Sequence, residues 1–253
     1  MAARLLFSYF FFFVCFSLKS IAQADNEIQV YASPTIGKQK TIVELHNNYT
    51  FTGVKGMANP ASARWLNHTL EITYGVAENV EIGFYTFVGL APNGKYQYLG
   101  NQIRPRVTAP SRWNLPFGAS LSVEFGRFRN DESIPFYWQG EVRPIIDKTF
   151  GNVYASLNPN IDFIASGAEK QVGFSPQFKT FYSIKQKVGL GIEYYSGWGA
   201  FNKILPVNQQ EHLFGPMFDL LAFPDWELQT GYLFGLTPNS NQSIFKLLVG
   251  KRF

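Results

Sequence analysis

Residues Phe245 to Phe253 read FKLLVGKRF and end the chain. Phe245, Leu247, Val249 and Phe253 share one parity, so that they fall on one face of a β-strand. A last strand with one apolar face and a terminal phenylalanine is typical of outer-membrane β-barrel chains. The ending therefore predicts a barrel in which apolar side chains meet lipid and polar side chains face the lumen.

The same alternation of apolar and polar residues recurs upstream, in short segments separated by turn residues. The clearest hairpin joins Leu66–Gly75 to Val80–Gly89, with Leu70, Ile72 and Phe84 among the residues expected to face outward. Counting such segments predicts twelve antiparallel strands: 41–53, 66–75, 80–89, 97–109, 115–126, 136–147, 152–164, 171–183, 188–196, 211–221, 226–235 and 242–253.

The predicted connections alternate between compact turns and longer, more variable links. In outer-membrane barrels the short turns face the periplasm and the longer loops face outside. An even number of strands then returns the C-terminus to the periplasm, where the barrel-assembly machinery would read Phe253. The predicted fold class is all-β: a single transmembrane antiparallel up-and-down β-barrel spanning residues 41–253. Residues 25–40 are expected to form a periplasmic N-terminal lead-in, with a short strand around residues 28–32.

The N-terminus predicts export. Arg4 precedes an apolar run from Leu5 to Leu18, and Ala22-Gln23-Ala24 suits cleavage after residue 24, so residues 1–24 read as a signal peptide. Its loss would remove Cys15, which leaves no thiol for a disulfide or a metal. It would also leave 20 basic and 18 acidic residues, a near-neutral balance that does not suggest a nucleic-acid partner. Together these features predict the outer membrane of a Gram-negative bacterium.

Two rival architectures fit the sequence less well. No run apart from the signal peptide approaches the roughly 20 apolar residues of a membrane-spanning helix. A soluble β-sandwich would not be expected to carry aromatic residues at its strand ends. Five prolines nevertheless fall inside proposed strands, where each removes a ladder hydrogen bond. We expect bulges or bends there, unless some strands are shifted by one or two residues: Pro105, Pro144, Pro159, Pro176 and Pro216.

Several segments together resemble a family of outer-membrane barrels related to the meta-pathway phenol-degradation transporter group. They are Val43–His46, His68–Thr73, Ile103–Val107, Glu141–Ile145, Ser175–Lys179 and Glu193–Tyr195. The resemblance runs from about Glu27 to Phe253. It implies a barrel that passes small hydrophobic or aromatic compounds, and it brings no catalytic residues.

The inward-facing positions are rich in charge, with more acidic than basic residues, and we take them as candidates for the lumen or solute path. If arginines 104, 106 and 143 pair with Glu124 and Glu141, the charges form a structural ladder; if they stay apart, they form a selectivity zone. The polar candidates are Glu44, His46, Glu71, Glu81, Arg104, Arg106, Glu124, Glu141, Arg143, Lys179, Glu193 and Glu227. The aromatic candidates, for which lumen packing is the alternative, are Tyr85, Phe87, Tyr137, Tyr154, Phe181 and Tyr195.

The function predicted from these features is a passive channel or transporter for small molecules that uses no cofactor. The alternatives are a closed structural barrel and an outer-leaflet lipid hydrolase, for which only His68 beside Asn47 and His212 near Ser196 offer a base. Glu44 and His46 could hold a metal, but a polar lumen role is favoured and no metal is predicted. Positive loop residues could bind lipopolysaccharide phosphates in the surrounding membrane, although ordinary solvated loop charge is the favoured interpretation: Lys55, Arg64, Lys95, Arg127, Arg129, Lys170 and Lys203.

Overall fold

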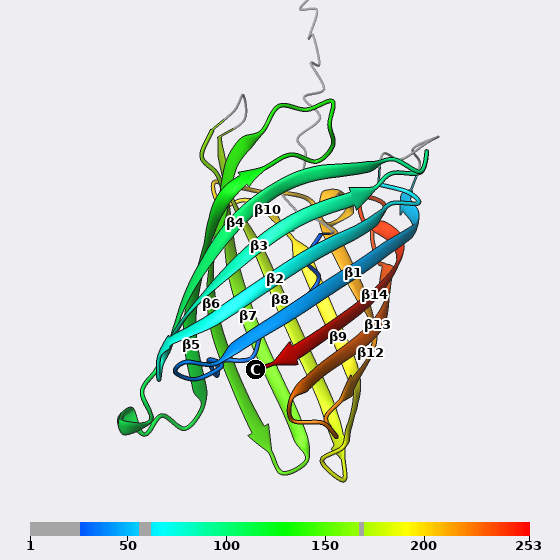
Figure 1. The fold of residues 1–253 in the computed structure, drawn as a ribbon. Coiled ribbons are helices and arrows are strands. Elements are labelled where there is room, and N and C mark those ends of the chain that lie inside the picture. Colours follow the sequence, from blue (N-terminus) through cyan, green and yellow to red (C-terminus); the bar gives the residue numbers. More distant parts are fainter. Residues whose placement is uncertain (1–25, 56–61, 167–169) are drawn as a thin grey trace, which may run out of the picture.

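The structure is a computed structural model that describes residues 26–55, 62–166 and 170–253. The predicted signal peptide therefore lies outside the described residues. Long tilted strands form the wall of a barrel, and the C-terminus lies at one of its ends (Figure 1). Among the described residues, we find no helix with the length and hydropathy needed to cross a membrane.

Twelve long strands make the wall, and each pairs antiparallel with its neighbours. Pairing of β1 with β14, where Ile42 lies opposite Arg252, closes the sheet into a barrel. The strands are β1 (Thr41–Val54), β2 (Leu66–Ala77), β3 (Val80–Leu90), β4 (Tyr96–Thr108), β5 (Gly118–Phe128), β6 (Tyr137–Phe150), β7 (Val153–Ile164), β8 (Gln171–Ile184), β9 (Val188–Gly197), β12 (Glu211–Leu220), β13 (Trp226–Gly235) and β14 (Asn241–Arg252).

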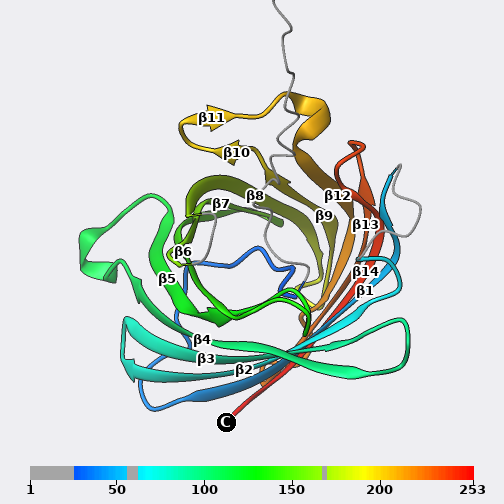
Figure 2. The ribbon, with the colours of Figure 1, turned by 90° about the horizontal axis from the view of Figure 1, so that it is seen from above.

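This architecture confirms the predicted twelve-stranded antiparallel barrel. The strand ends differ from the sequence prediction by at most three residues. The sequence pattern missed the two-residue strands β10 (Gly199–Ala200) and β11 (Lys203–Ile204), because pieces this short show no alternation. They lie in the link between β9 and β12, which extends away from the barrel rim when the barrel is seen along its axis (Figure 2).

The two ends of the barrel differ. We call the end where β1 begins and β14 finishes the turn end; it carries the links β2–β3, β4–β5, β6–β7, β8–β9 and β12–β13. The opposite, loop end carries the remaining links. The 3-10 helix η1 (Ser111–Trp113) lies in a turn-end link, and η2 (Val207–Gln209) lies in the loop-end link between β9 and β12.

The expected bulges at the five strand prolines are not found. The strand register is unbroken across each proline in the described ladders, and the register shifts lie elsewhere, for example between Thr50 and Thr52. Instead, the ladder to one of the two neighbouring strands is interrupted for a few residues. An example is the ladder between β6 and β7, where the register places Pro144 opposite Pro159. Pro159 also faces Pro176 across β8. A strand can thus accommodate a proline, which has no backbone N–H, without the extra residue of a β-bulge. The reason is that antiparallel neighbours exchange hydrogen bonds only at alternate residue pairs.

The alternation of side chains separates two faces as predicted. Leu70, Ile72 and Phe84 are each at least 40% exposed on the outer wall, whereas Glu71 and Glu81 on the same strands are fully buried inside. A one-residue slip would exchange these two sets, so the apolar outer face fixes the register of each strand.

The N-terminal segment, residues 26–36, corrects the expectation of a lead-in outside the barrel. It lies inside the ring of strands (Figure 2), and residues 26–31 are buried. No strand forms at residues 28–32. The physical reason is that the backbone of the segment forms hydrogen bonds with side chains of the inner wall and not with the backbone of a neighbouring strand.

Candidate functional site: an occluded lumen

The N-terminal segment is tied to the inner wall by hydrogen bonds to its backbone. The Tyr31 amide donates to Asn158 Oδ1 at 2.7 Å, and its carbonyl accepts from Ser156 Oγ at 2.6 Å. The Arg106 guanidinium donates to the carbonyls of Ala32 and Pro34 at 2.9 and 3.0 Å. Because these partners come from β4 and β7, the segment bridges separate parts of the wall.

The ends of the segment are held in the same way. The carbonyl of Asn26 accepts hydrogen bonds from Thr69 Oγ1 at 2.7 Å and from Asn48 Nδ2 at 3.2 Å. Towards the turn end, the Ser33 amide donates to Asp147 at 2.6 Å and the Ile36 amide to Glu81 at 2.8 Å. Asn48 lies near the middle of β1, and Thr69 lies in the loop-end half of β2. The segment therefore occupies the lumen from about mid-depth to the turn end.

One side of the segment is apolar. Ile28 and Val30 are buried in a cluster with inward-facing residues of β9 and β12–β14: Tyr195, Leu213, Leu233 and Ile244. Burying two aliphatic side chains of this size contributes about 1.5–3 kcal/mol each. The segment is thus held by apolar contact on one wall and by polar contact on the other.

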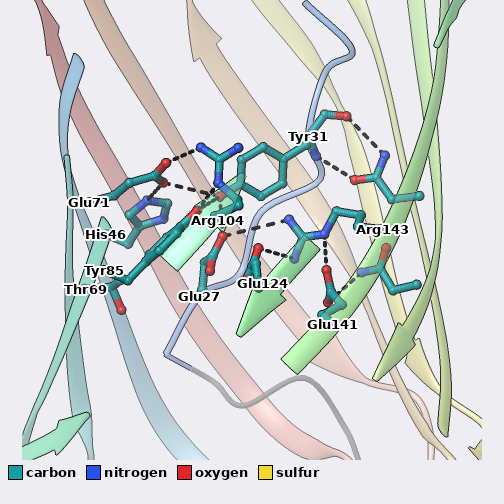
Figure 3. A network of polar contacts seen from close by, with 12 residues as sticks. Glu27, Tyr31, His46, Thr69, Glu71, Tyr85, Arg104, Glu124, Glu141 and Arg143 are labelled. Carbon is teal, nitrogen blue, oxygen red and sulfur yellow. Dashed lines mark hydrogen bonds and ion pairs between the residues drawn. The ribbon is translucent and has the colours of Figure 1, made fainter. Parts of the chain in front are cut away.

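The polar side centres on Tyr31, whose ring lies among the guanidinium groups of three buried arginines. Figure 3 shows two of them, Arg104 and Arg143. The guanidinium carbons of Arg143, Arg104 and Arg106 lie 4.4, 5.0 and 5.7 Å from the ring centroid, within cation–π range. The Tyr31 hydroxyl contacts Tyr85 Oη at 2.8 Å, Glu71 Oε2 at 3.3 Å and the Glu27 carboxylate. We call Tyr31, these arginines and their carboxylate partners the arginine network.

Arg104 and Arg106 pair with carboxylates on β2 and β3. Arg104 contacts Glu71 directly and reaches Glu81 at 3.0 Å, while Arg106 reaches the same Glu81 at 2.6 Å. Gly83 makes room for this packing, since an added Cβ there would lie 2.8 Å from Thr73 Oγ1 and 3.2 Å from Glu71 Oε1. The absence of a side chain at this inward position lets the ion pairs close.

Arg143 pairs with carboxylates from the wall and from the N-terminal segment. It contacts Glu141 directly, and its two Nη atoms lie 3.5 Å from Glu124 and 3.9 Å from Glu27. Figure 3 shows Glu27 and Tyr31 entering the network from the segment, between Arg104 and Arg143. Arg143 is 1% exposed, so these ion pairs are shielded from bulk water.

A second cluster, the lysine network, lies on the opposite wall. Lys246 Nζ lies 2.6 Å from Glu193, 2.7 Å from Gln229 Oε1 and 3.1 Å from Tyr195 Oη. Lys179 pairs with Asp219 at 2.8 Å. Each of the five buried arginine and lysine side chains in the described part of the chain therefore has a carboxylate partner nearby.

The structure places nearly all predicted lumen residues inside the barrel. The arginines do pair, as the structural-ladder interpretation proposed, although only Arg143 uses Glu124 and Glu141. Glu227 lies apart from both networks, at the turn end, where it is partly exposed and pairs with Arg252 at 2.8 Å. What these side chains do for a solute stays a prediction.

Aromatic rings connect the arginine network to the loop end. The Tyr85 ring stacks on Phe87 with centroids 5.9 Å apart, Phe87 meets Phe128 at 5.6 Å, and Phe128 meets Tyr137 at 6.1 Å. Tyr31 extends this aromatic row through its hydroxyl contact with Tyr85. Of the other predicted aromatic residues, Tyr154 and Phe181 pair near the turn end, with centroids 5.0 Å apart, and Tyr195 joins the lysine network.

Sequence reasoning missed the residues that the N-terminal segment contributes, above all Glu27 and Tyr31. Neither belongs to one of the twelve predicted strands, and residues 25–40 were expected to form a periplasmic lead-in. The inward-facing strand positions were seen to carry more acidic than basic residues, but this excess does not show which other part of the chain contacts them. The apolar pair Ile28 and Val30 was the available signal that this stretch is buried.

Three lumen residues could bind a metal ion. Glu44, His46 and Glu71 are all buried, and one possible ligand atom from each lies within 4.8 Å of the others. From the sequence, only Glu44 and His46 were expected to lie close enough to share a metal, and a polar lumen role was favoured for the histidine. Pairing of β1 with β2 adds Glu71, which lies opposite Glu44.

The ring nitrogens of the two histidines considered for a hydrolase contact side chains other than serine. His212 bonds through its two ring nitrogens to Tyr194 at 2.5 Å and Gln210 at 2.8 Å, while Ser196 donates to the Pro176 carbonyl. His68 contacts Asn47 at 2.7 Å, as the sequence suggested. Neither arrangement joins a histidine to a serine hydroxyl, which a serine nucleophile would require.

No protein-family model matches the sequence, and no curated protein is significantly similar to it. Among solved structures, the chain is similar to an outer membrane channel from Pseudomonas putida F1, at 13% identity and a TM-score of 0.63, over 90% of this chain and 100% of that one. It is also similar to the translocator domain of the autotransporter NalP from Neisseria meningitidis, at 10% identity and a TM-score of 0.52, over 87% and 89%. The fold is that of an outer-membrane β-barrel.

Proposed function

We propose that this protein is a passive outer-membrane channel for small aromatic molecules, held closed at mid-depth by its own N-terminal segment. The aromatic row from Tyr137 to Tyr31 carries the proposal, because it offers successive rings on which an aromatic solute can stack from the loop end inward. Aromatic pairs add about 0.5–1.5 kcal/mol beyond their burial, enough to guide a solute without trapping it.

The surroundings of Tyr31 indicate what the constriction can bind. A phenol ring there lies among guanidinium groups, with its hydroxyl against Glu71 and Tyr85. A small phenolic or other aromatic solute could make the same contacts when Tyr31 moves aside. The similarity to an outer membrane channel from Pseudomonas putida F1 supports the channel part of this proposal. The substrate class is suggested by the resemblance to the phenol-degradation transporter group.

A closed structural barrel is the second candidate, and the paired charges of the lumen favour it. Both networks fill the interior with matched ion pairs, as a permanently closed barrel would require. The difference between the two candidates is whether the N-terminal segment can leave its position. Its contacts are all non-covalent, which makes opening possible.

The membrane orientation belongs to the same proposal. We place the turn end, with the C-terminus, in the periplasm and the loop end outside. Six of the seven basic residues considered for lipopolysaccharide binding are exposed near the loop end: Lys55, Arg64, Lys95, Arg127, Lys170 and Lys203. Exposed basic residues such as Lys40, Lys148 and Lys187 also lie at the turn end, so the orientation rests on the mostly shorter links there.

Single-channel conductance of the refolded chain from residue 25 onward tests the function directly. A channel should show discrete current steps in planar bilayers, and phenol added on the loop-end side should reduce the ionic current as it occupies the aromatic row. Cyclohexanol, which has a similar size but no aromatic ring, is the matched control. A folded barrel that remains silent at every voltage would favour the structural alternative.

Replacing Glu71 and Glu81 by glutamine together should shift ion selectivity towards anions. Both carboxylates balance the charges of Arg104 and Arg106, and basic rings favour anions. The reversal potential in a salt gradient measures this shift. Glu78→Gln with Glu132→Gln removes two exposed carboxylates and serves as the control. Equal reversal potentials for the two double variants would argue against a role for the Glu71 and Glu81 pair.

A further inference from the structure

We propose that Glu44, His46 and Glu71 form a binding site for a divalent transition-metal ion, with Zn²⁺ as the probe ion. The site lies on the inner wall, where β1 and β2 pair. It uses one imidazole nitrogen and two carboxylate oxygens, which are ligands that zinc takes in proteins. This inference does not depend on the proposed channel function.

The distance between His46 and Glu71 fits a shared ion. His46 Nε2 lies 3.5 Å from Glu71 Oε2 and makes no hydrogen bond to the described residues. With zinc–ligand distances of about 2.0–2.2 Å and tetrahedral angles, two ligands lie about 3.4 Å apart. His46 is 2% exposed, and its Nε2 has only the long 3.5 Å ion-pair contact with Glu71 and no hydrogen bond to the described residues, so a closer partner would satisfy it.

Glu71 divides its two oxygens between different tasks. Its Oε1 accepts from Arg104 and from Thr73 Oγ1, while Oε2 faces His46 and the Tyr31 hydroxyl. One oxygen is therefore available to a metal without breaking the ion pair to Arg104. Arg104 and Thr73 would hold the carboxylate in position, as outer partners do in other metal sites.

Glu44 supplies the third ligand and the strongest electrostatic reason for a cation. It is 6% exposed and makes no hydrogen bond or ion pair with any residue that the structure describes. It packs beside Gly250, where an added Cβ would lie 2.9 Å from Glu44 Cγ. An ionised carboxylate buried in this way is costly unless it is paired with a charge or coordinates a metal.

The wider charge balance of the lumen points the same way. Among the described residues, eleven carboxylates are buried, against five arginine and lysine side chains. A bound divalent ion would supply positive charge beside the one carboxylate of this site that has no basic partner. The imidazole selects against Mg²⁺ and Ca²⁺, which prefer oxygen ligands alone.

Isothermal titration calorimetry of the refolded, EDTA-stripped barrel with ZnCl₂ tests the site. The expected result is one equivalent of bound Zn²⁺, with affinity lowered at least about tenfold by His46→Gln and by Glu44→Gln, since even the loss of an outer partner costs this much. His68→Gln with His212→Gln removes the other two histidines and should leave the affinity unchanged. The heat-dependent shift in gel mobility reports whether each variant is folded.

X-ray absorption at the zinc edge gives an independent readout in the unmodified protein. One imidazole nitrogen together with oxygen donors is expected in the first shell of the ion. An unmodified barrel that binds no Zn²⁺ would overturn the proposal, as would binding that survives both single substitutions. Binding that is lost only in the His68 and His212 double variant would assign the ion to the surface and also overturn it.

Discussion

A barrel that lacks residues 25–36 is expected to conduct ions several-fold better than the chain that starts at residue 25. The segment occupies the lumen from mid-depth to the turn end, and its removal withdraws Glu27, Tyr31 and the apolar pair Ile28 and Val30. A barrel of twelve strands is wider than the eight-stranded barrels that side chains alone can fill. Planar-bilayer recordings at equal salt on both sides measure the change.

A reversible tether gives the complementary experiment and guards against a deletion that fails to fold. A Cβ at position 118 would lie 2.2 Å from Ser33 Oγ and 2.0 Å from Asp147 Oδ1. Cysteines in place of Ser33 and Gly118 should therefore form a disulfide once the Asp147 side chain turns aside. The predicted mature chain has no other cysteine, so the bond would be specific. The oxidised barrel should stay closed, and reduction should restore the behaviour of the unmodified chain.

Ser33→Cys alone controls for the substitution, since it cannot form the bond within one chain. Equal conductance of the oxidised and reduced double variant would mean that opening does not involve movement at residue 33. Unchanged conductance after deletion, in a barrel shown to be folded, would mean that the segment does not limit the current. Both results together would contradict gating by the N-terminal segment.

Replacing Arg143 by methionine is expected to lower the free energy of unfolding by about 3–5 kcal/mol, the usual cost of removing one partner from a buried ion pair. The substitution leaves the carboxylates of Glu27, Glu124 and Glu141 without their shared cation. Methionine keeps most of the side-chain volume, so the loss reports charge more than packing. Reversible urea unfolding of the barrel in lipid vesicles measures it.

Lys251→Met is the matched control for this prediction. Lys251 pairs with Asp225 at 3.9 Å at the turn end, where both side chains are substantially exposed to solvent. An exposed pair of this kind contributes about 0–1 kcal/mol. Similar losses for the two variants would show that the arginine network adds no more to stability than a surface contact.

The wall of the barrel could be predicted from sequence because lipid and lumen demand opposite side chains at alternate positions. This demand places Ile72 outside and Glu71 inside whatever the neighbouring strands are. The pairing of the charges was only partly predictable, because the partner of each arginine depends on which carboxylates the strand tilt and register bring near it. Arg143 has the partners that the sequence suggested, whereas Arg104 and Arg106 use β2 and β3.

The occupation of the lumen could not be predicted in the same way. The alternation of Ile28 and Val30 with polar residues suggested a short strand, but the two sides of the segment contact different walls and its backbone bonds to side chains. Its partners, such as Asn158 and Asp147, are more than 100 positions away along the chain. Only the folded barrel brings them to Tyr31 and Ser33.

The seam between β1 and β14 has a consequence for the order of folding. It joins residues 42 and 252, the most distant parts of the barrel sequence, whereas the other wall pairings link strands that follow one another along the chain or flank the β10–β11 excursion. Because distant contacts carry the largest loop-closure cost, this seam should form last. The open sheet then gives the N-terminal segment lateral access to its partners until the final strand arrives. Pairing of the last strand, β14, with β1 would then close the barrel around the N-terminal segment. The C-terminal strand would therefore complete the enclosure of residues 26–36.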